Sequence, residues 1–268
     1  MSAFASRLVV GAIGLPVVLG IVWLGGWWLF GLLACAGLIA LHEFYSIARP
    51  LRPLVLAGYA GATATLLAAK LGGPYWLAGG LASTLAFAFL LALLAETRQS
   101  ATVAIGATVL GVVWIGVGLA HIQLLREHLG PHERLAVLTV LLAVFADDTA
   151  AYFSGRLVGR HKLAPVLSPG KTWEGFVVGS IVCVLVTFFA LYDDKNDFLN
   201  VWQALVLGCV IAVSEAAGDL FESMLKRDMQ VKDTGHLLGG HGGVLDRIDA
   251  LLFASAAAFY LVLGFGYS

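Results

Sequence analysis

Charged residues are scarce in this sequence. Only 12% of its 268 residues are Asp, Glu, Lys or Arg, whereas 60% are hydrophobic, and the mean hydropathy is +0.90. A soluble domain of this length needs a polar shell that so few charged residues cannot supply. The composition therefore excludes an ordinary soluble protein and indicates a chain whose surface faces lipid.

Cysteine is also rare, and the three cysteines do not form a motif. Cys35, Cys183 and Cys209 each stand alone in an apolar stretch, and no CxxC spacing occurs. This pattern argues against a disulfide framework and against a zinc site. The formal net charge of −1 says nothing about nucleic acid, but there is no basic tail or acidic run, and no nucleic-acid partner is expected.

Long apolar runs dominate the chain. A membrane-spanning helix needs about 20 mostly apolar residues, and lipid excludes unpaired backbone, so such runs are expected to be helices. The first run is expected to be a retained span, because a second apolar run follows it at once, where a cleaved signal peptide leads into a polar domain. We therefore expect an all-α polytopic integral membrane protein with about nine transmembrane helices, at Leu8–Leu24, Trp27–Ala48, Leu54–Lys70, Tyr75–Ala95, Ala101–Leu125, Leu135–Phe153, Trp173–Tyr192, Val201–Ala217 and Asp246–Gly266.

The sequence predicts a single membrane-embedded domain over residues 1–268. We expect N-terminal helices up to about residue 134, and catalytic helices and loops from about 135 to 268. Twelve of the sixteen Lys and Arg residues fall on the side of the predicted N-terminus. Because positive residues are enriched in cytoplasmic loops, we expect a cytoplasmic N-terminus and an external C-terminus. The two long polar loops, Ser154–Thr172 and Gly218–Leu245, then both lie on the cytoplasmic side.

Four polar residues near the end of the eighth predicted span have helical spacing. Asp219, Glu222, Ser223 and Lys226 are spaced i, i+3, i+4 and i+7, so on a helix they share one face. One interpretation is a solvated helix end. The other is a face that binds a hard cation through its carboxylates and a phosphate through Lys226, with Arg227 as a second phosphate ligand.

A glycine-rich segment leads into the last predicted span. Gly239, Gly240, Gly242 and Gly243 permit positive φ angles and close backbone approach, which suits a phosphate-binding loop before a helix N-terminus, although most such loops are only flexible turns. Two carboxylates, Asp246 and Asp249, follow in the opening turns of that span. They are either metal ligands or residues that stabilise the N-terminal end of the helix. His241 is either a phosphate ligand or an internal hydrogen-bonding group of the loop.

The segment Ala143–Gly175 holds a third group of polar residues. Asp147 and Asp148 stand in an otherwise apolar helix, where ionisable groups usually face a polar cavity. Asp148 and Tyr152 are spaced i, i+4 and can line one such cavity. The basic residues that follow, including Lys171, serve either as a positive-inside signal or as phosphate ligands. Two further acids in or near spans, Glu43 and Glu215, either line the site or are buried hydrogen-bonded groups.

The residues that carry this chemistry also resemble a known family. Ser223–Asp249, SMLKRDMQVKDTGHLLGGHGGVLDRID, is similar to the signature of phosphatidate cytidylyltransferases, also called CDP-diglyceride synthases, with the pattern S-x-x-K-R, K-D and H-G-G-x-x-D-R-x-D. The stretches DTAAYFSGR and LSPGKTWEG resemble two further motifs of this family. The chain departs from the family at Gly239, where proline is common. The resemblance extends over essentially the whole chain.

The resemblance implies an enzyme of phospholipid biosynthesis that transfers CMP from CTP to phosphatidic acid and releases pyrophosphate. It implies a Mg²⁺ cofactor with a second, monovalent cation as a further expectation, an active site at the cytoplasmic face of the bacterial inner membrane, and a homodimer. Its expected metal ligands are Asp219, Asp246, Asp249 and Glu222. Its expected catalytic residues are Asp148, Lys171, Lys226, Arg227 and His241, and its expected substrate-binding residues are Ser223, Lys232, Gly242, Gly243 and Arg247.

Two other functions fit parts of the pattern. A CTP-dependent polyprenol kinase also needs a nucleotide site at the membrane surface, but it transfers one phosphate and the 27-residue signature argues against it. A secondary transporter places ion-binding acids near the middle of the bilayer and shows repeat symmetry. Here the polar residues gather in two loops on one side, and no repeat is visible.

Overall fold

Long apolar helices make up most of the protein. The computed structural model describes residues 14, 16–94, 100–235, 237 and 242–267. Within these residues, eight helical stretches are long and apolar enough to cross a membrane: Gly26–Ile47, Val55–Gly72, Pro74–Leu94, Ala101–Glu127, Gly130–Val158, Trp173–Leu191, Val201–Asp228 and Leu245–Gly264. They confirm eight predicted spans and the all-α polytopic class. The remaining prediction, Leu8–Leu24, lies partly outside the described residues.

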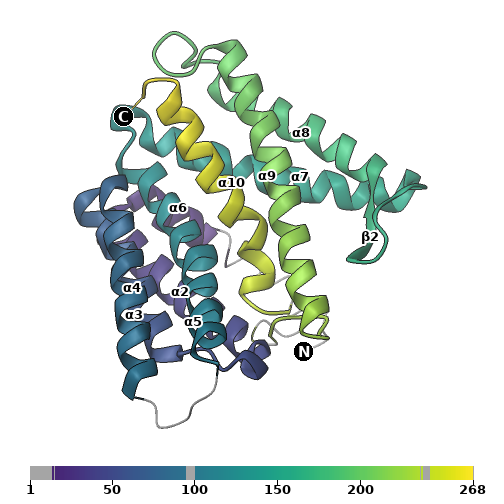
Figure 1. Ribbon diagram of the computed structural model, residues 1–268. Helices are drawn as coiled ribbons and strands as arrows, with labels where there is room; N and C mark the ends of the chain where they lie inside the picture. Colours follow the sequence, from purple (N-terminus) through teal and green to yellow (C-terminus); the bar gives the residue numbers. More distant parts are fainter. Residues whose placement is uncertain (1–13, 15, 95–99, 236, 238–241, 268) are drawn as a thin grey trace. The chain divides into compact units, whose positions relative to one another are not determined.

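The individual elements follow this order along the chain (Figure 1). The helices are α2 (Gly26–Ile47), α3 (Val55–Gly72), α4 (Leu77–Leu94), α5 (Ala101–Gly111), α6 (Val117–Glu127), α7 (Glu133–Val158), α8 (Trp173–Leu191), α9 (Val201–Asp228) and α10 (Leu245–Gly264). A five-residue π-helical turn, Val112–Gly116, joins α5 to α6 into one span. Short 3₁₀ turns at Arg49–Leu51, Pro74–Trp76 and Gly130–His132 lead into α3, α4 and α7.

The chain divides into two compact units. Unit 1 comprises the residues up to Glu127 together with Asp228–Ile248, and unit 2 comprises His128–Arg227 and Asp249–Ser268. Unit 1 therefore holds helices α2 to α6 and the segment between α9 and α10. Unit 2 holds helices α7 to α9 and most of α10. The predicted site residues are distributed over both units, and each unit is described separately below.

Charged side chains join helix ends at one end of unit 1. Lys70, at the end of α3, forms an ion pair with Glu127, at the end of α6, with a nitrogen–oxygen distance of 3.0 Å. Arg126 donates hydrogen bonds to the carbonyl oxygens of Val22 (2.8 Å) and Trp23 (2.9 Å).

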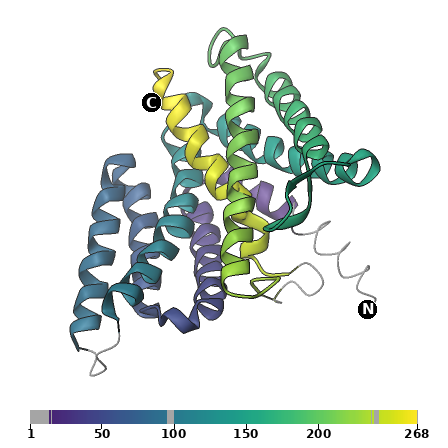
Figure 2. The ribbon, with the colours of Figure 1, turned by 45° about the vertical axis from the view of Figure 1, so that its right-hand side comes forward.

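Side-chain caps stabilise the starts of α8 and α9 in unit 2. The hydroxyl of Thr172 accepts a hydrogen bond from the Gly175 N–H (3.1 Å) and so caps α8. Asn200 and Gln203 exchange hydrogen bonds at the start of α9, each side-chain oxygen accepting from the other residue's backbone N–H. Helices α7 and α8 lie side by side (Figure 1). Contacts of Gly218 with the backbone of Asp249 and Ala250 bring α9 and α10 together (Figure 2).

A short β-hairpin occupies part of the segment Ser154–Thr172 that was predicted to be a loop. Strand β1 (Lys162–Ala164) pairs antiparallel with β2 (Ser168–Thr172), with Lys162 opposite Thr172 and Ala164 opposite Ser168. Within the described residues this is the one sheet of an otherwise helical chain. The prediction missed it because the segment contains Pro and Gly and lacks the alternation of apolar and polar residues that marks a half-buried strand.

Two helices extend further than predicted. Helix α7 continues past the predicted end at Phe153 to Val158, and α9 continues past the predicted end at Ala217 to Asp228. The predicted loops therefore begin as helix, and Asp219, Glu222 and Lys226 stand inside α9. Both extensions carry charged groups beyond the apolar stretch, which the hydropathy criterion for a span does not include.

Candidate functional site

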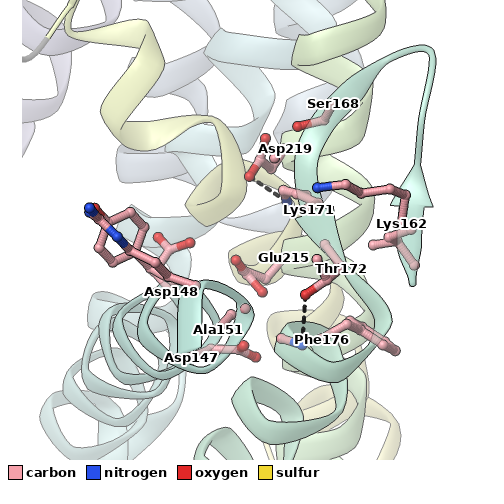
Figure 3. A pocket seen from close by; sticks show the side chains of 17 residues that line it. Asp147, Asp148, Ala151, Lys162, Ser168, Lys171, Thr172, Phe176, Glu215 and Asp219 are labelled. Atoms are coloured by element: carbon pink, nitrogen blue, oxygen red, sulfur yellow. Dashed lines mark hydrogen bonds and ion pairs between the residues drawn. The ribbon is translucent and has the colours of Figure 1, made fainter. Parts of the chain in front are cut away.

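Unit 2 contains a cavity of about 540 Å³ that is lined in part by charged side chains. The cavity lies among the C-terminal half of α7, the hairpin, the start of α8 and the C-terminal half of α9 (Figure 3). Its volume is within the usual range for small-molecule sites. The residues that line it are Asp147, Asp148, Ala151, Tyr152, Gly155, Arg156, Lys162, Leu163, Ser168, Gly170, Lys171, Thr172, Gly175, Phe176, Glu215, Ala216 and Asp219.

Four carboxyl groups line this cavity. Asp147 and Asp148 come from α7, and Glu215 and Asp219 come from α9, where they are one helical turn apart. Asp147, Asp148 and Glu215 lie within electrostatic reach of one another, as Figure 3 shows. Asp147 is 2% exposed, and its Oδ2 atom has no hydrogen-bond partner among the described residues. Carboxyl groups this close in a buried place need a proton or a cation between them.

Lysine side chains face the carboxyl groups from the hairpin. Lys171 on β2 forms an ion pair with Asp219 on α9. Figure 3 shows Lys162 extending from β1 toward the same region, and Arg156 lines the cavity from the last turns of α7. Both partners of the ion pair keep about a quarter of their side-chain surface exposed (25% for Lys171 and 27% for Asp219). A phosphate that enters the cavity can therefore reach this lysine.

Arg227 links the hairpin to α9 at a second point. Its Nε donates a hydrogen bond to the carbonyl oxygen of Leu167 at 3.2 Å, and Leu167 lies between the two strands. Arg227 was predicted as a phosphate ligand. In the structure Arg227 instead binds a backbone carbonyl of the hairpin. This hydrogen bond and the Lys171–Asp219 ion pair together attach the hairpin to the last turns of α9.

The polar residues predicted to share one face of α9 do contact one another along the helix. Ser223 donates to Oδ1 of Asp219 at 3.4 Å, and Lys226 forms an ion pair with Glu222. Asp249 of α10 lies close to Asp219 and Glu222. Three of the four predicted metal ligands, Asp219, Glu222 and Asp249, thus meet within unit 2. Glu222 and Asp249 are buried, at 2% and 7% exposure.

The fourth predicted metal ligand, Asp246, belongs to unit 1. Its carboxylate accepts backbone hydrogen bonds from the N–H groups of Thr234 (3.1 Å) and Gly243 (2.8 Å). Gly242 has a φ of +78°, a conformation that favours glycine. Asp246 was expected either to bind a metal or to stabilise the N-terminal end of α10, and its contacts show the second role. A metal-binding role stays a prediction.

The remaining predicted site residues lie partly in unit 1 and partly in the cavity of unit 2. Lys232 and Arg247 are exposed residues of unit 1. Gly243 is buried beside Glu43 and Asp246. His241 lies outside the described residues, so its predicted role is untouched by the structure. Glu43 lies against the segment that precedes α10, and Glu215 lines the cavity.

The site has donors of the kind that bind Mg²⁺. In the described part of the chain, no group of three or more His, Cys, Asp or Glu side chains is arranged to hold a metal ion. Mg²⁺ is commonly held by one or two carboxylates, with phosphates and water as its other ligands. The carboxylates of Asp219 and its neighbours fit that chemistry, and the buried, unpaired Oδ2 of Asp147 shows that the cavity has unused acceptor capacity.

Sequence reasoning missed several residues that line the cavity. Lys162, Ser168 and Thr172 belong to the hairpin, and Arg156 belongs to the extension of α7. The basic residues of this segment were visible in the sequence. However, nothing in their spacing indicated a hairpin that turns two lysines toward one cavity. The signal available was the motif LSPGKTWEG, which contains Ser168, Lys171 and Thr172.

The chain is similar to proteins of a known enzyme family. The model of the cytidylyltransferase family matches residues 5–265. A relative from Staphylococcus haemolyticus, named phosphatidate cytidylyltransferase, is 40% identical over 144 residues, which is 54% of each chain. One of the same name from Haemophilus influenzae is 43% identical over 126 residues, 46% of this chain and 44% of the relative.

The chain spans about half the length of the curated relatives it matches. The family model, by contrast, covers nearly all of it. That match confirms the resemblance read from Ser223–Asp249 and the two upstream motifs: the chain belongs to the cytidylyltransferase family.

Proposed function

We propose that this membrane protein transfers CMP from CTP to phosphatidic acid, forming CDP-diacylglycerol and pyrophosphate. The observation that carries the proposal is the cavity of unit 2, in which Lys171 and Lys162 stand beside the carboxylates of Asp148, Glu215 and Asp219. Cations that neutralise phosphates, next to carboxylates suited to a divalent cation, are the requirements of phosphoryl-type transfer. The names of the relatives support CTP and phosphatidate as the substrates.

The reaction joins two anions, so charge neutralisation and alignment are its main demands. An oxygen of the phosphatidate phosphate attacks the α-phosphorus of CTP, the bond from that phosphorus to the β-phosphate oxygen breaks, and pyrophosphate leaves with the bonding electrons. The attacking oxygen is already anionic, so no separate general base is needed. In this proposal Lys171 and Lys162, which line the cavity, bind phosphate oxygens, and Arg227 holds the hairpin that carries them.

Mg²⁺ is part of the proposal. When bound, it would neutralise charge on the triphosphate and help to align the leaving group. Asp219, with Glu222 and Asp249 beside it, is the proposed protein contribution in unit 2, and Asp246 is the contribution expected in unit 1. A monovalent cation near the carboxyl groups of Asp148 and Glu215 would complete the expected pair of ions.

The proposed setting is the bacterial inner membrane, with the active site open to the cytoplasm. Support comes from the distribution of Lys and Arg, twelve of sixteen of which fall on the predicted cytoplasmic side. Labelling of a single cysteine introduced in Ser154–Thr172 tests the orientation. Labelling of that cysteine from outside intact cells would contradict a cytoplasmic position of this segment. The homodimer implied by the family is tested by the mass of the purified protein in detergent.

The decisive assay uses purified protein, CTP, Mg²⁺ and phosphatidic acid in mixed micelles. The proposal predicts a liponucleotide and one pyrophosphate per CTP consumed. A parallel reaction replaces phosphatidic acid with a polyprenol. Formation of CDP and a polyprenyl phosphate there, without a liponucleotide in the first reaction, would replace the proposal with the kinase alternative.

A further inference from the structure

Glu43 is an acidic residue buried in unit 1. It lies in the last turns of α2, within a membrane span, and is only 6% exposed. An ionisable group at such a position is costly unless specific partners satisfy it, and it is therefore a candidate for function. Glu43 does not line the cavity of unit 2. Its hydrogen-bond partners lie within unit 1.

The carboxylate of Glu43 binds the backbone where α10 begins. Its Oε1 accepts a hydrogen bond from the N–H of Val244 at 3.0 Å, and its Oε2 accepts one from the N–H of Leu245 at 2.8 Å. These N–H groups are among those that a helix leaves unpaired at its N-terminus, where an anion is also favoured by the helix dipole. Glu43 therefore caps α10 from a helix about 200 positions earlier in the chain.

Two glycines allow this close contact. A Cβ atom at Gly243 would lie 2.5 Å from Oε2 of Glu43, and a Cβ atom at Gly235 would lie 2.5 Å from Oε1. Real Cβ atoms do not approach an oxygen so closely, so a larger residue at either position would displace the carboxylate. Two separate points of the segment between α9 and α10 thus pack against the same side chain.

Asp246 is connected to the same backbone. Gly243 packs against Glu43 and donates its N–H to Oδ2 of Asp246 at 2.8 Å, while Thr234 donates its N–H to the same carboxylate. Asp246 also follows Leu245 directly, and the Leu245 N–H is bound by Glu43. The two carboxylates therefore hold one short stretch of chain between them, Glu43 from α2 and Asp246 from α10.

We infer that Glu43 is a positioning residue for Gly242–Asp246, the part of the family signature expected to present backbone N–H groups and a carboxylate to the substrates. This inference rests on the proposed function. Glu43 acts through Gly243, Val244 and Leu245 and has no contact with substrate in this account. Its carboxylate fixes where α10 starts and hence which way Asp246 faces.

Glu43→Gln tests the inference because it preserves size but leaves one oxygen to accept from two backbone N–H groups. The matched control is Glu127→Gln, which removes an acid of unit 1 that is paired with Lys70, without touching Gly242–Asp246. Hydrogen–deuterium exchange of peptides covering Gly242–Ile248 reads the contact directly, without reference to activity. Activity is measured in parallel as a function of CTP, phosphatidic acid and Mg²⁺ concentration.

We expect faster exchange at Gly242–Ile248 in Glu43→Gln, with α3 and α6 unchanged. We also expect turnover to fall about 10- to 100-fold, as for groups that orient a metal ligand. The Mg²⁺ concentration needed for half-maximal activity should rise, and the KM for phosphatidic acid should change less. Glu127→Gln should show neither the local exchange nor the Mg²⁺ effect.

Several outcomes overturn the inference. Unchanged exchange at Gly242–Ile248, or faster exchange throughout unit 1 with normal Mg²⁺ dependence, would make Glu43 a residue of general stability only. If Glu43→Gln does not fold, Gly243→Ala disturbs the same contact from the other side and must give the same local exchange and Mg²⁺ effects. If the wild-type protein forms no liponucleotide, the proposed function fails, while the exchange result still decides whether Glu43 holds this segment.

Discussion

Asp219 and Asp246 were both predicted to be metal ligands, yet the structure gives them different partners. Asp219 in unit 2 interacts with side chains, an ion pair with Lys171 and a hydrogen bond from Ser223. Asp246 in unit 1 accepts hydrogen bonds from the backbone N–H groups of Thr234 and Gly243. One carboxylate belongs to a cavity, and the other holds the fold of its own segment.

The difference indicates that Asp219 is available for substrate binding, whereas Asp246 also stabilises the local backbone. Side chains that pair with Asp219 can rotate toward a phosphate while the backbone stays in place. A carboxylate that holds backbone cannot lose its charge without loosening the chain around it, because buried N–H groups need acceptors. Substitutions at the two positions should therefore reduce activity for distinguishable reasons.

The largest effect is expected for Asp246→Asn. The amide keeps the size of the carboxylate, but it loses the charge expected to bind Mg²⁺ and accepts less well from two backbone N–H groups. Activity should fall at least about 100-fold, the loss typical of removing a group that stabilises charge in a transition state. Exchange at Gly242–Ile248 should also increase. An active variant with normal Mg²⁺ dependence would contradict the metal assignment.

Asp219→Asn should lose a similar factor of activity, again about 100-fold, while its segment stays ordered. Its contacts are with the side chains of Lys171 and Ser223, so exchange along α9 and thermal stability in detergent should match the wild type. If α9 becomes less protected in this variant, the contrast between the two acids is wrong.

Lys171→Ala should reduce the catalytic efficiency for CTP by about 10- to 100-fold, because it removes a cation from the cavity. Lys195→Ala is a suitable control, since Lys195 lies in the turn after α8, next to Tyr192, and does not line the cavity. Steady-state kinetics with CTP varied distinguishes the two. Equal, small effects of both substitutions would remove Lys171 from the site.

A smaller effect on turnover and a larger one on stability are expected for Lys226→Ala. Lys226 pairs with the buried Glu222, so the substitution leaves that carboxylate without its ion-pair partner. Loss of one partner from a buried pair is usually more harmful than loss of both. The double variant Lys226→Ala with Glu222→Gln should therefore recover thermal stability. A double variant less stable than Lys226→Ala would contradict this account of the pair.

Much of the fold was predictable because the membrane imposes a simple rule. Lipid requires long apolar helices, and eight predicted spans agree with the structure to within a few residues at most ends. The exceptions are informative. Helices α7 and α9 run on into charged sequence, where intrahelical pairs such as Glu222–Lys226 continue the helix although hydropathy no longer marks it.

The candidate site was only partly predictable. Helical spacing placed Asp219, Glu222, Ser223 and Lys226 on one face, because that relation is local. The hairpin was missed, since Lys171–Asp219 and Arg227–Leu167 are contacts between residues far apart in sequence. The partner of Val244 and Leu245 was missed for the same reason: Glu43 lies in α2, and no pattern in the sequence links it to α10.

The most direct test of the central claim follows the phosphorus atoms of CTP. Purified protein is incubated with Mg²⁺, phosphatidic acid and CTP labelled at either the α- or the γ-phosphate. We predict that the α label enters the lipid product, that the γ label appears in pyrophosphate, and that Asp219→Asn suppresses both. Transfer of the γ label to lipid with release of CDP, or wild-type activity in Asp219→Asn, would contradict this prediction.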